Sequence, residues 1–243
     1  MKYGIFSDVH GNYAALKAVL DFYRQNGVEN FVCCGDIVGY GPQPLECAET
    51  LRGLENLVAV MGNHDAALVG KMDIKWFNPN AAWAIEFARS QLTAPALDFI
   101  SRLPEKAETK EFMTVHGSPR KPLTEYLLSE VQFMDNAGKW AVSPCFIGHS
   151  HMPLYFRERE EGLPETDFIK PLEKIAVDGR LILNPGSVGQ PRDGDTRAAC
   201  GIYDSDKKYF ELHRVFYDVE AVQKMMAGLN MPAILSERLS FGF

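Results

Sequence analysis

Short hydrophobic runs alternate with amphipathic segments along the first half of the chain. Runs of three to five apolar residues, rich in β-branched and aromatic side chains, predict buried strands. Between the first two runs, Leu16, Val19, Leu20 and Tyr23 recur at helical spacing and predict a helix from Tyr13 to about Asn26. This alternation of strand and helix predicts an α/β fold. The predicted strands are Tyr3–Phe6, Phe31–Cys34, Leu57–Met61, Phe112–Val115 and Cys145–Ile147.

The pattern changes twice further along the chain. A short helix begins at Pro42 and ends near Leu51, and from residue 66 to 110 the pattern is helical, with helices that begin at Pro79 and Pro95. The last third is rich in strands and closes with two helices. We therefore predict one domain over residues 1–243, with a helical insertion at about 70–110. The late elements are Leu154–Arg157, Leu181–Leu183, Ala198–Tyr203, Tyr209–Tyr217, Val219–Leu229 and Ala233–Leu239.

Composition limits the classes of protein to which the chain can belong. Of 243 residues, 46% are hydrophobic and 23% are charged, as is typical of a soluble globular protein. A net charge of −7 disfavours broad binding to nucleic acid or to an anionic membrane. No apolar stretch approaches the ~20 residues that span a bilayer. The odd number of cysteines, and a first strand that directly follows Met1-Lys2, predict a cytoplasmic protein with reduced thiols and no signal peptide.

Five of the six histidines lie in short polar segments at the ends of the predicted strands. They are His10, His64, His116, His149 and His151, and Asp36 follows the second strand in the same way. In open α/β sheets, ligands bind at the carboxyl ends of the strands, so we expect these side chains to lie close together. The sixth, His213, lies in a late strand without a motif, and we expect it to be structural.

These segments form an ordered series that resembles the calcineurin-like metallophosphoesterases. The series is Asp-x-His from Asp8, Gly-Asp at Asp36, Gly-Asn-His-Asp from Gly62, Val-His-Gly at His116 and Gly-His-x-His from Gly148. A further segment, Asn184 to Arg192, is similar to one common in the small bacterial and archaeal members. The resemblance implies a four-layer α/β/β/α sandwich, in which two mixed β-sheets lie face to face with helices outside.

The resemblance also implies two divalent metal ions and their ligands. One ion would be held by Asp8, His10, Asp36 and His151, and the other by Asp36, Asn63, His116 and His149, so that Asp36 bridges the pair. A mixed set of nitrogen and oxygen donors suits Mn²⁺ first, and also Fe, Zn²⁺, Co²⁺ or Ni²⁺. Two such ions activate water and neutralise charge in an in-line displacement at phosphorus. The resemblance therefore implies attack by a metal-bridging hydroxide.

The leaving oxygen in such a reaction needs a proton. By its place in the Asn-His-Asp segment, His64 resembles the general acid of the family. Asp65 could orient the His64 ring, or it could instead be the N-cap of a helix over residues 66–69.

One departure from the family bears on the substrate. The Ser/Thr phosphoprotein phosphatases carry Asp-Arg-Gly where this chain has Gly39-Tyr40-Gly41. The carboxylate that steadies the acid histidine and the arginine that binds the phosphate are therefore both absent. This favours the smaller phosphodiesterase-like and nucleotidase-like members over protein phosphatases.

Other residues must then contact the substrate. Asn12 could donate to a phosphate oxygen, cap the first helix, or both. Arg120 and Arg192 could each bind a phosphate, or be solvated surface residues. Tyr40, Trp76 and Phe77 could line a pocket and stack on a base, although for Trp76 and Phe77 the favoured interpretation is helix-packing core.

We therefore predict an enzyme, a dinuclear metal-dependent phosphoesterase that acts on a phosphodiester or a nucleotide-like polyphosphate. The alternatives are a phosphomonoesterase, a protein phosphatase, or a non-catalytic scaffold of the same fold. The scaffold is disfavoured because His64 and all seven ligands are present. The predicted partner is a small-molecule phosphoester and not a membrane or extended nucleic acid, and the oligomeric state is left open.

Overall fold

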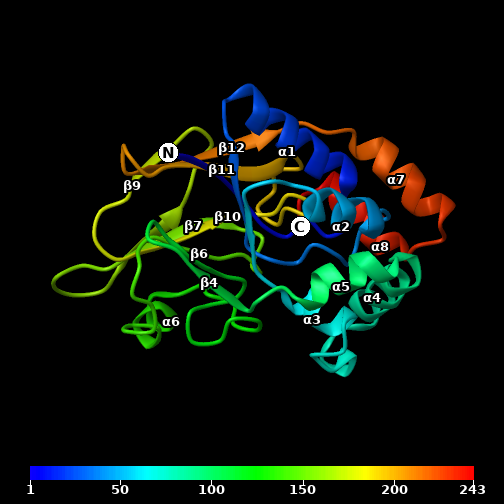
Figure 1. Cartoon of the computed structure of the whole chain (residues 1–243), viewed down its shortest axis with the longest axis horizontal. Coiled ribbons are helices and arrows are strands. Elements are labelled where there is room, and N and C mark those ends of the chain that lie inside the picture. Colours follow the sequence, from blue (N-terminus) through cyan, green and yellow to red (C-terminus); the bar gives the residue numbers. More distant parts are fainter.

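A computed structural model describes residues 1–243, which form two six-stranded mixed sheets with helices around them (Figure 1). The first sheet has the order β3-β2-β1-β11-β12-β9 and the second β4-β5-β6-β10-β7-β8. The first sheet consists of β1 (Lys2–Phe6), β2 (Asn30–Cys33), β3 (Leu57–Ala59), β9 (Lys174–Ala176), β11 (Ala198–Asp204) and β12 (Tyr209–Val215). The second consists of β4 (Lys106–Glu108), β5 (Met113–Val115), β6 (Cys145–Phe146), β7 (Pro153–Arg157), β8 (Glu165–Phe168) and β10 (Leu181–Pro185).

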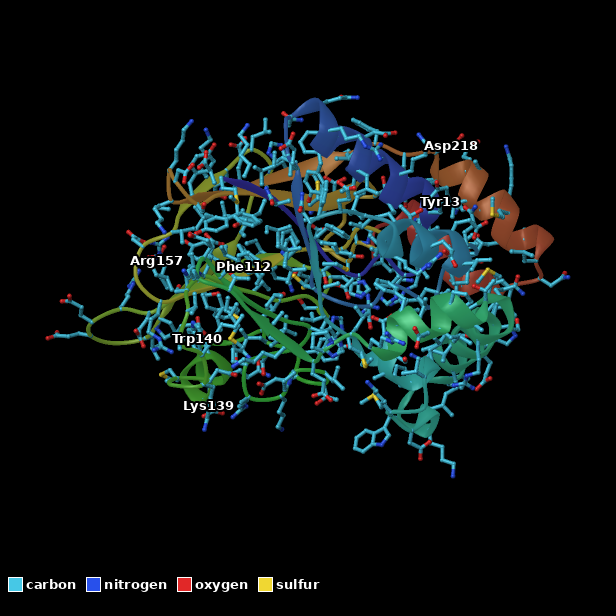
Figure 2. All side chains as sticks on the ribbon, in the orientation of Figure 1. Tyr13, Phe112, Lys139, Trp140, Arg157 and Asp218 are labelled. Carbon is cyan, nitrogen blue, oxygen red and sulfur yellow. The ribbon has the colours of Figure 1, made fainter.

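The two sheets pack face to face through large apolar side chains. Phe146 of β6 meets Tyr203 of β11, with ring centroids 5.5 Å apart, and Phe112 lies 5.2 Å from Tyr3 of β1. Figure 2 shows Phe112 in the interior of the molecule and Lys139 at its edge. Alternate residues of each buried strand face this central layer because side chains alternate across a pleated sheet.

Helices cover the outer faces of both sheets. On the first sheet lie α1 (Tyr13–Gln25) and α2 (Pro44–Arg52), whose buried side chains join the largest apolar cluster. The stripe predicted on α1 is buried, and the Tyr23 hydroxyl donates to the carbonyl of Ile5 at 2.9 Å. On the second sheet, α6 (Glu130–Asp135) contributes Phe133, which stacks on Phe156 of β7. The predicted α/β class and four-layer sandwich are thus confirmed.

The helical segment after β3 lies at one end of the molecule (Figure 1). It comprises α3 (Asn63–Leu68), a 3-10 turn over Ile74–Trp76, α4 (Pro79–Gln91) and α5 (Ala94–Ser101), and residues 106–108 return to the second sheet as β4. The C-terminal α7 (Val219–Gly228) and α8 (Ala233–Glu237), with a last 3-10 turn over Arg238–Ser240, pack against α4 through an apolar cluster that includes Ala81, Met226 and Leu239. No helix has the length and apolar character that a membrane crossing requires.

Several elements differ from the sequence predictions. The second helix begins at Pro44 rather than Pro42, and the predicted insertion is helical only as far as Ser101. The strands β4, β8 and β9 and the helix α6 were not predicted. All three strands are short and partly exposed, so they carry no continuous apolar run.

Candidate metal centre

The predicted ligands lie on loops that leave the carboxyl ends of strands in both sheets. Five of the seven have left-handed backbone conformations, with φ of 53° at Asp8, 47° at His10, 54° at Asp36, 69° at His149 and 61° at His151. Positive φ is uncommon for residues other than glycine and clusters at functional sites. These loops are therefore shaped to direct side chains at one point.

One group of donors consists of Asp8, His10 and His151. The His151 Nε2 atom lies 3.3 Å from Asp8 Oδ1 and 3.1 Å from His10 Nε2. The three donor atoms lie within 4.8 Å of one another. Although Asp8 and His10 are more than 140 positions from His151 in the chain, the three residues form one ligand-like set.

A second group consists of Asp36, His116 and His149, with Asn63 beside it. His116 Nε2 lies 3.3 Å from Asp36 Oδ2, 3.1 Å from His149 Nδ1 and 3.0 Å from Asn63 Oδ1. Asp36 Oδ2 is also 3.6 Å from His10 Nε2 in the first group. Asp36 therefore lies between the two groups, where a bridging carboxylate would be.

The hydrogen bonds of three rings support a cation at this point. The Nδ1–H groups of His10, His116 and His151 donate to the carbonyls of Val38, Cys34 and Gln190 at 3.0, 2.8 and 2.6 Å, so each ring presents its Nε2 atom to the other donors. In the neutral rings of His10 and His151 this Nε2 atom carries a lone pair. The Nε2 atoms of His10 and His151 face each other at 3.1 Å. Two lone pairs at that distance repel unless a cation lies between them, so the donor set fits a divalent metal.

Burial acts on the charge state of these groups. All seven side chains are at most 9% exposed. Burial lowers the pKa of His10, of His151 and, to about 3, of His149, which favours the neutral imidazole that metals bind. Burial also opposes charge on His116, but the Asp36 carboxylate outweighs it and raises that pKa to about 9.

Two glycines let the loops approach the carboxylates. A methyl group on Gly62 would overlap the Asp36 carboxylate, and one on Gly148 would overlap the Ser7 hydroxyl and lie 2.8 Å from Asp8 Oδ2. Gly62 has φ of −95°, which any residue can adopt, so close approach is the reason for glycine there.

His64 lies at the rim of the two groups with its ring packed among aromatic rings. Its ring centroid is 4.9 Å from that of His10, 4.6 Å from Tyr40 and 5.0 Å from Phe77. The buried Nδ1 atom has no hydrogen-bond partner, and Gly39 lies beneath it. Burial lowers the pKa of His64 to about 4. No carboxylate steadies this ring, as the departure at residues 39–41 indicated.

Asp65 does not contact the His64 ring through a hydrogen bond. Its carboxylate accepts from the backbone N–H groups of Ile37, Val38 and Gly62 at 3.0 to 3.2 Å. The helix begins at Asn63 with Gly62 as its N-cap, so the prediction that Asp65 caps a helix over residues 66–69 was wrong. Asp65 instead ties the Asp36 loop to the start of α3.

The four predicted substrate contacts occupy different surroundings. The Asn12 amide is buried, caps α1 by accepting from Ala15 N and donates to Gly189 O at 3.0 Å. The Arg120 guanidinium pairs with Glu125 and with Asp135 at 2.9 Å and has no hydrogen bond to a predicted ligand. The polar groups of both side chains therefore already bond within the protein.

Tyr40 and Arg192, in contrast, adjoin the donor groups. The Tyr40 ring lies 4.6 Å from the rings of both His10 and His64, and the Arg192 guanidinium carbon is 6.0 Å from the Tyr40 ring centroid. His213 lies apart from the centre, beside Phe22 and Glu211 on β12, as expected of a structural residue.

A cavity of about 290 Å³ opens above His64, Asn63 and His149. Its walls include Tyr40, Phe77 and Trp76. Trp76 is 81% exposed, so the favoured interpretation that Trp76 is helix-packing core was wrong. Tyr126, which was not predicted as a site residue, stacks on His149 with ring centroids 3.8 Å apart. Tyr126 lies in an irregular loop, where no periodicity marks it.

A buried set of imidazole and carboxylate donors with a cavity on one side defines a class, that of metal-dependent enzymes. Comparison with known proteins identifies the family. Residues 1–208 match the calcineurin-like phosphoesterase superfamily domain. The chain belongs to this superfamily and is a metal-dependent hydrolase of phosphoric esters.

Three relatives illustrate the similarity. The protein MJ0912 of Methanocaldococcus jannaschii is 36% identical over 245 residues, which cover 98% of this chain and 97% of MJ0912. The crystal structure of a metallophosphoesterase from Sphaerobacter thermophilus has a TM-score of 0.89 and 40% identity, and covers 100% of this chain and 99% of its own. Phosphodiesterase YfcE of Escherichia coli is 31% identical over 137 residues, 51% of this chain and 72% of YfcE.

Proposed function

We propose that the two donor groups hold two divalent ions and that the enzyme hydrolyses a phosphodiester or a nucleotide-like polyphosphate. One ion would be held by Asp8, His10 and His151, and the other by Asn63, His116 and His149. Asp36 would bind both ions. The observation that carries the proposal is the pair of facing Nε2 lone pairs, 3.1 Å apart, next to a carboxylate shared between the groups. Mn²⁺ is the first choice of ion for this donor set.

When bound, such ions activate water for attack and neutralise charge on the phosphoryl oxygens. The remaining steps fall to side chains of the chain itself. His64 is the proposed general acid that protonates the leaving oxygen; for this role its pKa, about 4 in the free site, must rise when the negative charge of the substrate phosphate binds beside the ring. It borders both the donor groups and the cavity, and its ring is held by packing. Asp65 has a positioning role, because it fixes the backbone directly after Asp36 and at the start of α3.

A diester or nucleotide substrate is favoured by the walls of the cavity. Trp76, Phe77 and Tyr126 offer aromatic faces next to His64 and His149, and such faces bind bases or aryl groups. Tyr40 and Arg192 are the remaining proposed contacts to the substrate. Asn12 and Arg120 are not included in the proposed substrate site, because their polar groups already bond within the protein.

We also propose a cytoplasmic location. All five cysteines are buried and unpaired, as is common in reducing compartments.

The test is hydrolysis by metal-stripped protein that is re-supplied with Mn²⁺. Four substrates are compared: an aryl phosphomonoester, its bis-aryl diester, a dinucleoside polyphosphate and a phosphopeptide. We expect turnover that requires the metal and prefers the diester or the polyphosphate. Trp76→Ala should reduce kcat/KM for the nucleotide more than for the aryl diester, and Trp83→Ala, on α4, is a matched control.

Preference for the monoester would favour the phosphomonoesterase alternative, and turnover of a phosphopeptide alone would favour a protein phosphatase. No turnover of any substrate, with two ions bound per chain, would support the scaffold alternative. Fewer than two ions bound per chain at saturation would contradict the dinuclear assignment itself.

A further inference from the structure

Two arginines differ from all the others in this chain. Of the twelve arginines, ten form an ion pair with an acidic side chain. Arg192 and Arg238 form none. In a protein with a net charge of −7, two guanidinium groups without a carboxylate partner indicate a place for an external anion.

Both unpaired arginines lie next to Tyr40, which adjoins the two donor groups. The Arg192 guanidinium carbon is 6.0 Å from the Tyr40 ring; its Nη2 donates to Gln190 Oε1 at 3.0 Å, and its buried Nε has no partner. Arg238 begins the last 3-10 turn and lines a second cavity of about 330 Å³ together with Tyr40 and Asn78. Tyr40 and Asn78 also line the cavity above His64, so the two cavities adjoin.

The surroundings of the second cavity favour negative charge. No acidic side chain lines either cavity. Asn78 is the N-cap of the 13-residue helix α4, so the positive end of that helix faces the same space. Burial and the neighbouring charge of Arg192 both lower the pKa of Arg238, which indicates that the two guanidinium groups act on each other.

The fold holds Arg238 at this place by packing. Leu235 and Leu239, on either side of it in sequence, are buried in the apolar cluster that joins α7 and α8 to α4 and Tyr40. The Arg238 side chain itself makes no hydrogen bond within the protein. The backbone at Arg238 is thus fixed, and its unpaired guanidinium has its donors available for a ligand.

We propose that Arg192 and Arg238 form a second anion site, which binds a further phosphate group of the substrate next to the phosphate cleaved at the metal centre. This inference rests on the proposed function and narrows its substrate class. The substrate would be a phosphoester that carries a chain of phosphates, such as a nucleoside or dinucleoside polyphosphate, rather than a diester with a single charge.

The test is direct binding of inorganic orthophosphate, pyrophosphate and tripolyphosphate to Mn²⁺-loaded protein by calorimetry. Wild type, Arg238→Gln and Arg238→Lys are compared in one buffer of fixed free Mn²⁺, so that chelation by the ligand is the same for each. Arg102→Gln, which removes an exposed arginine of α5 paired with Asp98, is the matched control. Thermal melting shows whether each variant is folded.

We expect wild type to bind tripolyphosphate more tightly than orthophosphate. Arg238→Gln should weaken tripolyphosphate binding about 10-fold and orthophosphate binding less than about twofold, because the substitution removes one charge-assisted contact to a later phosphate of the chain and none to the first. Arg238→Lys should retain part of the difference in affinity between tripolyphosphate and orthophosphate, and Arg102→Gln should retain all of it. The shortest phosphate chain whose affinity is lowered by Arg238→Gln indicates how far the second anion site lies from the proposed metal ions.

Two results would overturn the inference: equal affinities of wild type for the three anions, or equal weakening of all three by Arg238→Gln. Neither result affects the metal centre. Failure of the proposed function has a different signature, namely that the protein binds no Mn²⁺ or that orthophosphate does not bind to the Mn²⁺-loaded protein.

Discussion

Removal of the metal ions should lower the thermal stability of this protein by a large and measurable amount. The seven proposed ligands are at most 9% exposed, and two of them are carboxylates. Without a cation, the facing Nε2 atoms of His10 and His151 and the charge of Asp36 are compensated only by neighbouring rings and N–H groups. Since the unfolded chain would not keep seven donors from distant loops together, the ions should bind the folded state almost exclusively.

The expected magnitude follows from linkage. A ligand at 100 times its dissociation constant stabilises the folded state by about 2.7 kcal/mol, so two independent ions contribute roughly 5 kcal/mol. For domains of 150–250 residues, each kcal/mol shifts Tm by about 2–4 °C. The metal-stripped protein should therefore melt roughly 10–20 °C below the Mn²⁺-saturated protein.

The assay is scanning calorimetry of metal-stripped protein over a series of free Mn²⁺ concentrations. Asp36→Asn should lose more than half of the Tm shift, because Asp36 serves both proposed ion positions. Asp98→Asn, which removes an exposed carboxylate on α5, should keep the full shift. A wild-type Tm that is independent of Mn²⁺, or a full shift in Asp36→Asn, would refute the reasoning.

Three further predictions concern single residues. His64→Gln should slow hydrolysis of esters with a poor leaving group by about 10²–10⁴-fold and of 4-nitrophenyl esters much less, since the latter need no proton; equal losses in steady-state assays would argue against a general acid. Gly62→Ala should abolish the Mn²⁺-dependent Tm shift because its methyl group overlaps Asp36, whereas Gly53→Ala, whose methyl group meets only backbone oxygens at 3.5 Å or more, should not. Hydrogen bonds from Arg120 and other donors hold the pKa of Glu125 at about 2, so Glu125 stabilises the fold above its usual pKa and loses this effect as the pH falls from about 4.5 towards 2. Urea unfolding should therefore find Glu125→Gln less stable by about 1–3 kcal/mol at pH 7 and by much less near pH 2, and a difference that does not vary with pH would count against this account.

The sequence predicted the buried half of the fold better than its edges. Strands β1, β2 and β10 are apolar runs because helices or the other sheet cover both of their faces, and such runs are visible without a structure. β8 and β9 lie at sheet edges, where partial exposure permits mixed residues, and their pairing is set by β7 and β12 instead. Tertiary contacts therefore determine that these residues form strands, and no local sequence pattern predicts it.

Within the candidate site, the donors could likewise be predicted from the sequence, whereas the residues around them could not. Short motifs could indicate the seven donors because each motif contains both the donor and the glycine or turn that directs it. The surroundings of the donors have no such pattern. Tyr126 lies in an irregular loop, and Arg238 belongs to a turn after α8, more than 80 residues beyond the last donor. Arg120, close to His116 in sequence, instead pairs with Glu125 and Asp135. Proximity in sequence therefore does not identify the residues around the donors.

The strained conformations of the donor loops are maintained by bonds between the loops. Asp8 N and His10 N donate to the carbonyls of Gly35 and Asp36, each at 3.0 Å, so the first two loops brace one another. His149 N donates to the Asp8 carboxylate at 3.1 Å and thereby connects the second sheet to the first. Because each loop is fixed by another, a donor can keep a left-handed backbone that would cost of order 1 kcal/mol or more in isolation. The same hydrogen bonds between loops connect the two donor groups. A substitution at Asp36 should therefore alter the conformation of both groups even before any ion binds.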